Sequence, residues 1–234
     1  MKEHGIIFKG PLVRAIMEGA KTQTRRVPSS ANTLVDGGRV SAKAWKAFEW
    51  DWDGAVVDPG PSVAGYPGPF LKVPSRAFGT GHRLMPKWAQ DDGLWVRETW
   101  RVKLMDGGDE LEGVFLGYAA DDGELYCGEG FTRKEQYEQA LRYHSKRWKS
   151  SIHMPRWASR LTLQVTRVWP ERVQEISYED ELAEGCQLAE GENRFPFRTL
   201  WDEINGPRGW AWELNRPVWC IEFERVEGAG KVAT

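Results

Sequence analysis

The chain has 234 residues, a formal net charge of −2 and 13 tryptophans. Its length suits one domain with a large insertion better than two full-sized domains, and it is long enough to bury a core without disulfide bonds. The small net charge excludes a global basic field that grips duplex nucleic acid, so any contact with nucleic acid must be local.

The three cysteines lie far apart and match no metal-ligand spacing. They are Cys127, Cys186 and Cys220. We therefore expect reduced thiols in a cytoplasmic protein, with no metal site and no cofactor. Residues 1–10 lack the long apolar run of a signal peptide, and no stretch approaches the length of a membrane span. We therefore expect no membrane partner, and the sequence leaves the oligomeric state open.

The amino-terminal segment predicts a strand, a helix and a polar strand, in that order. Residues 5–10, GIIFKG, form a short β-rich run between glycines. In residues 11–19, PLVRAIMEG, Pro11 stands where a first helical turn tolerates it and Gly19 stands at the helix stop. In residues 21–27, KTQTRRV, polar side chains alternate on both faces of a strand. Such a strand is more typical of a groove than of a core.

Residues 28–89 contain many prolines and glycines and no long periodic segment. Such a stretch is unusual inside a compact domain. It predicts a loop-rich insertion, or simply a packed surface flap, within a single domain of residues 1–234.

Regular patterns resume after residue 90. The expected strands and hairpins are 91–102, 114–128, 160–173 and 217–226. The expected helices are 132–148, which carries many charges, 177–185, with Ser177 as its N-cap, and 198–206. Many strands with a few short helices predict an α+β fold built on a small β-barrel.

Lys21 lies close to two further cations in the sequence GAKTQTRR. A single lysine at a turn is more often solvated than catalytic. Arg25 and Arg26 are like charges that lower the pKa of a neighbouring ammonium, and a neutral lysine can act as a base. Thr24 falls on the opposite face of a regular strand, unless a bend after Gly19 brings it into one pocket with Lys21.

Two glutamates have both a structural and a functional interpretation. Glu184 ends the expected helix 177–185, where the helix dipole disfavours negative charge. It is either a solvated helix-end residue or a proton carrier with a raised pKa. Glu98 lies in an otherwise apolar strand, either as a paired carboxylate or as an acceptor for the exocyclic amine of a base.

Residues 148–163, WKSSIHMPRWASRLTL, combine basic and aromatic side chains. Aromatic rings beside guanidinium groups suit nucleic acid, because a stacked base contributes ~1–3 kcal/mol and arginine binds phosphate. Arg156 and Trp157 are candidates for these contacts, together with Trp100. Tryptophan-rich loops also close barrels, so both interpretations stand. His153 by itself is more typical of a hydrogen-bonded structural residue than of a base.

Taken together, these segments resemble the ASCH domain family, the β-barrel relatives of PUA domains. EGAKTQTRR is similar to the family signature G-x-K-T-x-T-x-R, GLWVRE to its G-D-x-L-x-V strand, EDELAEG to its helix with an acidic end, and VWCIEFERV to its closing strand. The resemblance covers about residues 6–27 and 91–226, and the family's Gly-Asp turn appears here as Asp92-Gly93. SIHMPRWASR and LWDEING resemble the long ASCH proteins of tailed bacteriophages and prophages.

The resemblance implies a PUA-like barrel with a cleft for RNA or a nucleobase. Small bacterial members of the family remove the acyl group from N4-acetylcytidine with a lysine, a threonine and a glutamate. The matching positions in this chain are Lys21, Thr24 and Glu184. We therefore expect a hydrolase that cleaves the amide bond of an N4-acylated cytidine or a related modified nucleoside.

Two alternatives remain beside this hydrolase. One is a non-catalytic module that binds single-stranded RNA, single-stranded DNA or a modified base, and the other is a ribonuclease. The insertion and the additional tryptophans favour the binding module, because a small nucleoside hydrolase needs neither. The expected substrate-binding residues are Arg25, Arg26, Glu98, Trp100, His153, Arg156 and Trp157.

Overall fold

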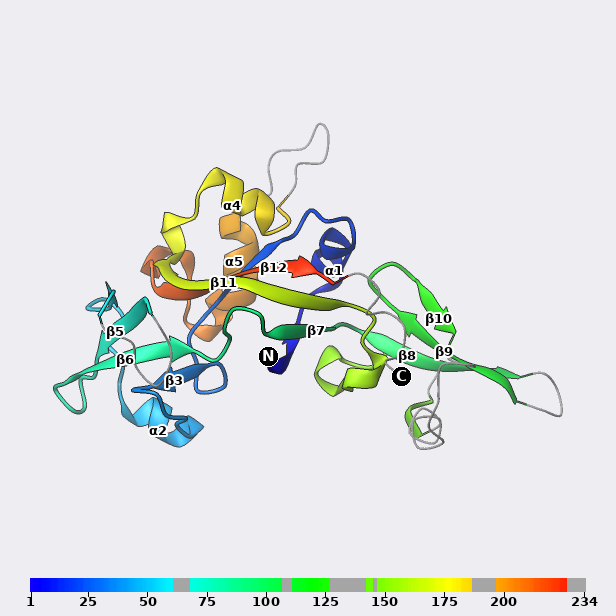
Figure 1. Ribbon diagram of the computed structural model, residues 1–234, viewed down its shortest axis with the longest axis horizontal. Coiled ribbons are helices and arrows are strands. Elements are labelled where there is room, and N and C mark those ends of the chain that lie inside the picture. Colours follow the sequence, from blue (N-terminus) through cyan, green and yellow to red (C-terminus); the bar gives the residue numbers. More distant parts are fainter. Residues whose placement is uncertain (61–67, 107–110, 127–141, 145–146, 187–196, 227–234) are drawn as a thin grey trace. The chain divides into compact units, whose positions relative to one another are not determined.

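The computed structural model describes residues 1–60, 68–106, 111–126, 142–144, 147–186 and 197–226 (Figure 1). The chain divides into two compact units. Unit 1 comprises Met1–Gly19, Asp92–Gln164 and Glu224–Thr234, and unit 2 comprises Ala20–Asp91 and Val165–Phe223. The single domain expected from the sequence stays a prediction. The expected insertion, residues 28–89, lies entirely within unit 2.

In the described residues, unit 1 combines one α-helix with two groups of strands. Its elements are β1 (Glu3–Ile7), α1 (Gly10–Met17), β7 (Gly93–Arg97), β8 (Trp100–Asp106), β9 (Leu111–Tyr118), β10 (Glu124–Tyr126), the 3-10 turns η1 (Ser151–His153) and η2 (Arg156–Ala158), and the start of β11 (Thr162–Arg172). Strand β7 pairs in parallel with β1 and antiparallel with β11. Strands β8, β9 and β10 form a separate antiparallel sheet. The helix expected over residues 132–148 lies largely outside the described residues.

The expected order of strand, helix and strand is present, with bounds that differ from the expected ones: β1 ends at Ile7, α1 begins at Gly10 and β2 begins at Gln23. Helix α1 ends at Met17, and Gly19 adopts φ +75°, a left-handed conformation that favours glycine. The reversed turn Asp92-Gly93 has its own role, because the buried Asp92 carboxylate accepts a hydrogen bond from the backbone N–H of Lys2 at 2.7 Å. This bond holds the start of β1 against the start of β7.

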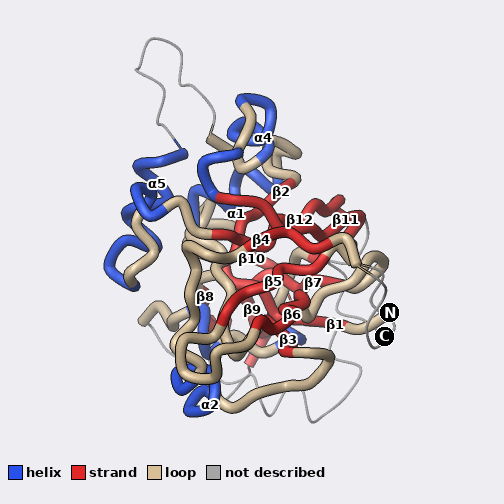
Figure 2. Tube along the Cα trace, turned by 90° about the vertical axis from the view of Figure 1, so that its left-hand side faces the viewer, coloured by secondary structure: helices blue, strands red, loops and turns tan. Residues whose placement is uncertain are grey.

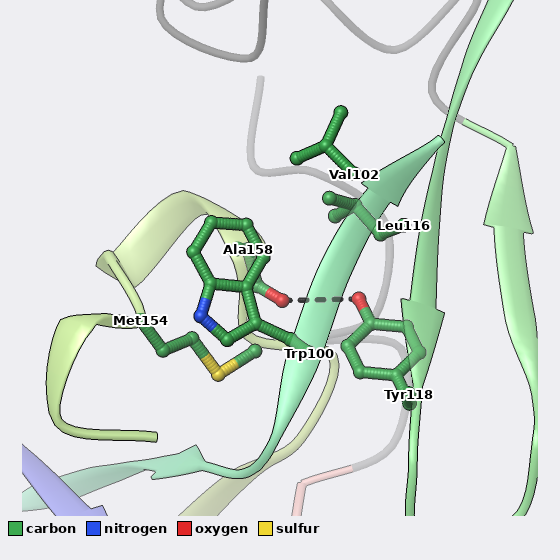
Figure 3. Close-up of a cluster of buried hydrophobic side chains, with 6 residues drawn as sticks. All are labelled: Trp100, Val102, Leu116, Tyr118, Met154 and Ala158. Atoms are coloured by element: carbon green, nitrogen blue, oxygen red, sulfur yellow. Dashed lines mark hydrogen bonds between the residues drawn. The ribbon is translucent and has the colours of Figure 1, made fainter. Parts of the chain in front are cut away.

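The core of unit 1 lies between the β8–β9 sheet and the turns η1 and η2 (Figure 3). Its buried members are Trp100, Val102, Leu116, Tyr118, Met154 and Ala158. The hydroxyl of Tyr118 donates to the carbonyl of Ala158 at 3.0 Å, so the one polar atom that Tyr118 brings into this core is satisfied (Figure 3).

Unit 2 contains the remaining elements. They are β2 (Gln23–Arg26), β3 (Thr33–Val35), α2 (Ala42–Ala47), β4 (Val56–Asp58), β5 (Phe70–Pro74), β6 (Gly81–Pro86), most of β11, η3 (Val173–Glu175), α4 (Tyr178–Ala183), α5 (Phe197–Asn205), η4 (Gly206–Arg208), η5 (Trp212–Leu214) and most of β12 (Pro217–Arg225). The strand order is β11-β12-β2, and β12 pairs antiparallel with β2. Helices α4 and α5 lie beside these strands (Figures 1 and 2).

The insertion differs from the loop-rich segment that the sequence predicts. Its strands form an antiparallel sheet in the order β3-β6-β5-β4. These strands span only three to six residues each. Because such short strands are separated by glycine and proline, they leave no long periodic pattern in the sequence. The indole N–H of Trp219 in β12 donates to the Thr33 hydroxyl of β3 at 3.0 Å and joins this sheet to the strand.

The α+β class expected from the sequence is confirmed, whereas the closed barrel is not found in the described residues. The described strands form three open sheets. The physical reason is that the strands of the insertion pair with one another, and β8, β9 and β10 do the same, so that neither group completes a ring of strands. None of the described helices is long and apolar enough to cross a membrane.

Candidate functional site

Lys21 and Glu184 face each other across an antiparallel bridge between the start of β2 and the end of α4. The backbone supports this contact, because Thr22 N–H donates to the carbonyl of Ala183 at 2.8 Å. Helix α4 in turn begins at Ser177, whose side chain accepts from the N–H of Asp180, as the sequence predicts. The chain thus brings together two residues that lie 163 positions apart.

The ammonium of Lys21 makes three hydrogen bonds. It donates to the Glu184 carboxylate at 2.6 Å, to the Glu184 carbonyl at 2.8 Å and to the Gln23 carbonyl at 2.6 Å. Both side chains are closed to solvent, since Lys21 is 2% exposed and Glu184 is 3% exposed. Burial lowers the pKa of Lys21, against the opposing effect of the Glu184 charge. The pair is therefore an ion pair in which Lys21 gives up its proton more readily than a lysine in water does.

Arg25 lies among three carboxylates. Its guanidinium contacts Glu171 at 2.6 Å, Asp180 at 3.1 Å and the second oxygen of Glu184 at 3.3 Å. Burial opposes the charge of Arg25, but Glu184 and Glu171 outweigh it and raise its pKa above the ordinary value. Arg25 thus stays charged and holds the Glu184 carboxylate in place opposite Lys21.

Thr24 and Arg26 occupy the other positions of β2. Thr24 lies opposite Ile221 in the register with β12, and Arg26 lies opposite Trp219. Strand alternation places Thr24 on the face opposite to that of Arg25, and the side chain is buried. Burial, with Arg208 as a neighbouring like charge, lowers the pKa of Arg26 to about 10. Of the candidate residues in β2 and just before it, Lys21 and Arg25 are the two that contact Glu184 directly.

A cavity of about 240 Å³ lies beside Glu171, one of the three carboxylates that contact Arg25. Its wall includes Glu171, whose second oxygen accepts from the Trp169 indole at 3.0 Å. The remaining lining residues are Ala55, Val56, Val57, Leu71, Arg172, Glu175 and Pro217. Glu171 therefore connects a partly apolar cavity to the buried ion pairs.

Glu98 has a structural partner in unit 1. Its two oxygens accept from the Arg160 guanidinium at 2.9 and 3.0 Å, and Arg160 also holds Asp121. Arg160 stacks on the Tyr118 ring at 4.1 Å. Burial raises the pKa of Glu98, which is 1% exposed, against the opposing effect of Arg160. This geometry fits the interpretation of Glu98 as a paired carboxylate better than that of a base-reading acceptor.

The aromatic candidates of unit 1 belong largely to its core. Trp100 is 0% exposed, so its ring faces are covered by protein and cannot stack on a base in this conformation. Trp157 is half-buried and meets Trp100 edge to face at 5.9 Å. Arg156 pairs with Glu3 at 3.0 Å, and His153 is exposed at the end of η1. These residues belong to unit 1, whereas the Lys21 contacts belong to unit 2.

The sequence does not reveal which carboxylates pair with Arg25 and Arg160. Glu171 and Asp180 hold Arg25, while Asp121 joins Glu98 at Arg160. A usable signal exists for Arg25, because an arginine in a buried strand requires carboxylates around it. The signal does not say which carboxylates, since they come from distant parts of the chain.

The two cysteines in the described residues, Cys186 and Cys220, are buried and form no disulfide bond. Cys127 lies outside the described residues. Burial raises the pKa of Cys220 well above the ordinary value, which keeps this thiol protonated. The described part of the chain also holds no group of three or more histidine, cysteine or acidic side chains placed to bind a metal ion.

Comparisons of the chain with protein-family models, with curated proteins and with solved structures found no match.

Proposed function

We propose that this chain is a nucleobase-recognising protein of the PUA-like ASCH type, and that it hydrolyses the amide bond of an N4-acylated cytidine or a related modified nucleoside. One observation carries the proposal. Lys21 and Glu184, which the resemblance assigns to catalysis, are in contact at 2.6 Å in a buried site although they lie 163 residues apart. A solvated turn lysine and a solvated helix-end glutamate would have no reason to meet in this way.

The chemistry requires a base and an acid at one place. Neutral Lys21 takes a proton from a water molecule as the water oxygen attacks the carbonyl carbon of the acyl group. Lys21 passes this proton to the Glu184 carboxylate, which it contacts at 2.6 Å, and Glu184 delivers it to the leaving amine as the C–N bond breaks. With water as the nucleophile, the products are a carboxylic acid and the free exocyclic amine of the base. The lowered pKa of Lys21 supports the first step because it makes the neutral amine accessible nearer to neutral pH.

Arg25 has a positioning role in this proposal. It contacts the Glu184 oxygen that does not contact Lys21, so it fixes the orientation of the carboxylate. Another carboxylate partner of Arg25, Glu171, lines the cavity of about 240 Å³. The cavity meets this network of ion pairs at Glu171, and its apolar wall suits the flat face of a pyrimidine.

Release of cytidine from N4-acetylcytidine, followed by chromatography, tests the proposal. We expect turnover by the wild-type protein and none by Lys21→Met, whose side chain is of similar length and carries no charge. Lys43→Met is the matched control, since Lys43 is exposed on helix α2. Circular dichroism of each variant shows whether it is folded. No turnover by the wild-type protein with acetyl, propionyl and larger N4-acyl cytidines would refute the proposal.

A second candidate function, a binding module without turnover, also has a specific observation in its favour. The three donors of the Lys21 ammonium all have acceptors, and its side chain is 0% exposed. A structural ion pair would have this same geometry. In that case modified nucleosides bind the wild-type protein, for example by isothermal titration calorimetry, and stay chemically unchanged after prolonged incubation.

A further inference from the structure

Four cations of unit 2 gather beyond the end of strand β2. They are Arg26, Arg39, Lys87 and Arg208, and we call them the Arg26 cluster. Arg26 belongs to β2, Arg39 and Lys87 to the insertion, and Arg208 to the turn η4. Arg39 and Arg208 are exposed, whereas Arg26 and Lys87 are half-buried.

Hydrogen bonds of the backbone bring Lys87 close to Arg26. The Asn32 side-chain amide donates to the carbonyl of Val27, which follows Arg26, at 2.9 Å. The Asn32 carbonyl in turn accepts from Lys87 N–H at 3.0 Å. One residue thus joins the end of β2 to the start of the segment that carries Lys87.

A second path leads to the same place. Arg26 lies opposite Trp219 in the strand register, and the Trp219 indole donates to Thr33 at 3.0 Å. Thr33 lies opposite Pro86, the residue before Lys87. Two independent sets of contacts therefore fix this part of the insertion beside β2.

The other two cations flank this junction. Val27 packs against a cluster that contains Trp201 and Trp210, and these residues bracket the turn that carries Arg208. Arg39 follows the turn in which Val35 and Gly38 exchange backbone hydrogen bonds at 2.8 Å, at the end of β3.

In the described part of the chain, three cations of the cluster lack the carboxylate partners that other cations of the insertion have. Arg76 pairs with Asp51 and Arg83 with Asp58. Within the described ranges, Arg39, Lys87 and Arg208 form no ion pair with a carboxylate. Burial lowers the pKa of Lys87, and Arg39 and Arg26 lower it further as like charges. Cations held together in this way favour a bound anion.

We propose that the Arg26 cluster binds the phosphate group of the substrate, so that the protein acts on a modified nucleoside phosphate in preference to the free nucleoside. This inference rests on the proposed function, because it assigns the base of the same molecule to the Lys21–Glu184 site. A phosphate fits the cluster since guanidinium groups bind its oxygens in pairs. Arg26 links the two places, because it directly follows Arg25 in strand β2, and Arg25 contacts Glu184 at 3.3 Å.

Calorimetric titration of cytidine, cytidine 5′-monophosphate and inorganic phosphate tests the inference. We expect the monophosphate to bind the wild-type protein about tenfold or more tightly than cytidine does. This difference corresponds to the one or two charge-assisted hydrogen bonds that the phosphate adds. The double variant Arg39→Gln/Arg208→Gln changes two exposed residues, one in a loop and one at the end of the turn η4. It should lose most of this preference and bind cytidine as the wild-type protein does.

The control is Lys43→Gln/Lys46→Gln, which removes the same charge from exposed positions of helix α2. This control should keep the preference for the monophosphate. Equal binding of cytidine and its monophosphate by the wild-type protein would overturn the inference, and so would equal losses in the two double variants. Binding of inorganic phosphate alone, with no gain for the monophosphate, would also overturn it, since the cluster would then be a separate anion site.

The proposed hydrolysis can fail separately from this inference. If the monophosphate preference depends on Arg39 and Arg208 but no N4-acyl compound is turned over, the cluster binds phosphate in a protein without this activity. If N4-acetylcytidine and its 5′-monophosphate are hydrolysed with equal kcat/KM, the hydrolase stands and the phosphate site is refuted.

Discussion

The carboxylate of Glu184 is divided between two cations, with Oε2 at 2.6 Å from Lys21 Nζ and Oε1 at 3.3 Å from Arg25. All three side chains are buried. A buried ion pair is costly to break by removing one partner, because the remaining charge stays in a poorly solvated place. The same arrangement that could serve proton transfer therefore also influences stability.

A double-mutant cycle measures this coupling. Lys21→Met should lower the free energy of unfolding by about 3–5 kcal/mol, because the buried Glu184 carboxylate then keeps Arg25 but loses the closer of its two cations. Glu184→Gln should cost a similar amount, whereas the double variant should cost less than the sum of the two. Urea denaturation gives the values, with Lys43→Met as a control expected within about 0.5 kcal/mol of wild type. Additive costs would show that the two residues do not interact.

The pH dependence of activity should follow the protonation of Lys21. As a general base it works without its proton, so kcat/KM should rise with pH through a pKa below the ordinary 10.5. Arg26→Gln removes a like charge and should move this rise to higher pH. Lys43→Gln removes an equal but distant charge, and should leave the profile where it is. A profile that Arg26→Gln does not move would argue against Lys21 as the titrating group.

The free energy of unfolding should also depend on pH, because burial lowers the pKa of Lys21 in the folded chain. The folded chain loses the Lys21 proton at a lower pH than the unfolded chain, whose lysine keeps it up to about 10.5. Between these two values the unfolded state binds more protons, so this group makes the free energy of unfolding rise with pH. The rise should be smaller in Lys21→Met, as measured by urea denaturation at several pH values. A rise of the same size in this variant would assign it to other groups.

Arg160 should be important for the stability of unit 1. Arg160→Met leaves Glu98 buried without its cation, which should cost about 3–5 kcal/mol at neutral pH. Burial already raises the pKa of Glu98 above its ordinary value of 4.5. The contribution of Glu98 to the free energy of unfolding therefore falls as pH rises from 4.5 through this raised pKa. Removing Arg160 raises this pKa further, and the cost should therefore be larger at pH 7 than at pH 4.5.

The matched control for Arg160 is Arg156→Met. Arg156 pairs with the half-exposed Glu3, and a surface pair of this kind contributes only about 0–1 kcal/mol. Denaturation curves of both variants at the two pH values compare the buried pair with the exposed one. Equal costs for Arg160 and Arg156 would contradict the burial argument.

Trp100 should act on folding and not on ligand binding. Its full burial predicts that Trp100→Ala lowers the free energy of unfolding by about 3–5 kcal/mol. Trp148 is 39% exposed, so Trp148→Ala should have a much smaller effect. Oligonucleotide binding per folded molecule, measured by fluorescence anisotropy, should stay unchanged in Trp100→Ala. Weaker binding by the folded variant would restore Trp100 as a stacking residue.

The sequence predicts those elements of the fold whose signals are local. Helix α1 with its stop at Gly19, the Ser177 cap of α4 and the long strand β11 all follow from patterns within about ten residues. Closure of a sheet is different, because it depends on which distant strands pair. The sheet of the insertion could not be foreseen for that reason, and its short strands pair with one another where a loop-rich segment was expected.

The residues of the candidate site also differ in how much the sequence alone could reveal about them. Lys21 and Glu184 could be named through the signatures that surround them, and the structure adds that they are in contact. Trp100 and Glu98 also stand out in the sequence, but burial and pairing follow from tertiary packing that no local pattern records. The same holds for Glu171, which reaches Arg25 from the far end of β11.

The pairing of β2 implies an order of events during synthesis. Among the described strands, its only neighbour is β12, whose paired residues are Trp219–Glu222. The ribosome makes β2 early, yet almost two hundred further residues must emerge before this partner exists. Until then the strand that carries Arg25 presents unpaired backbone groups, and a nascent chain with such an edge is prone to mispairing. Truncated products that end before β12 should therefore be inactive and candidates for chaperone binding or degradation.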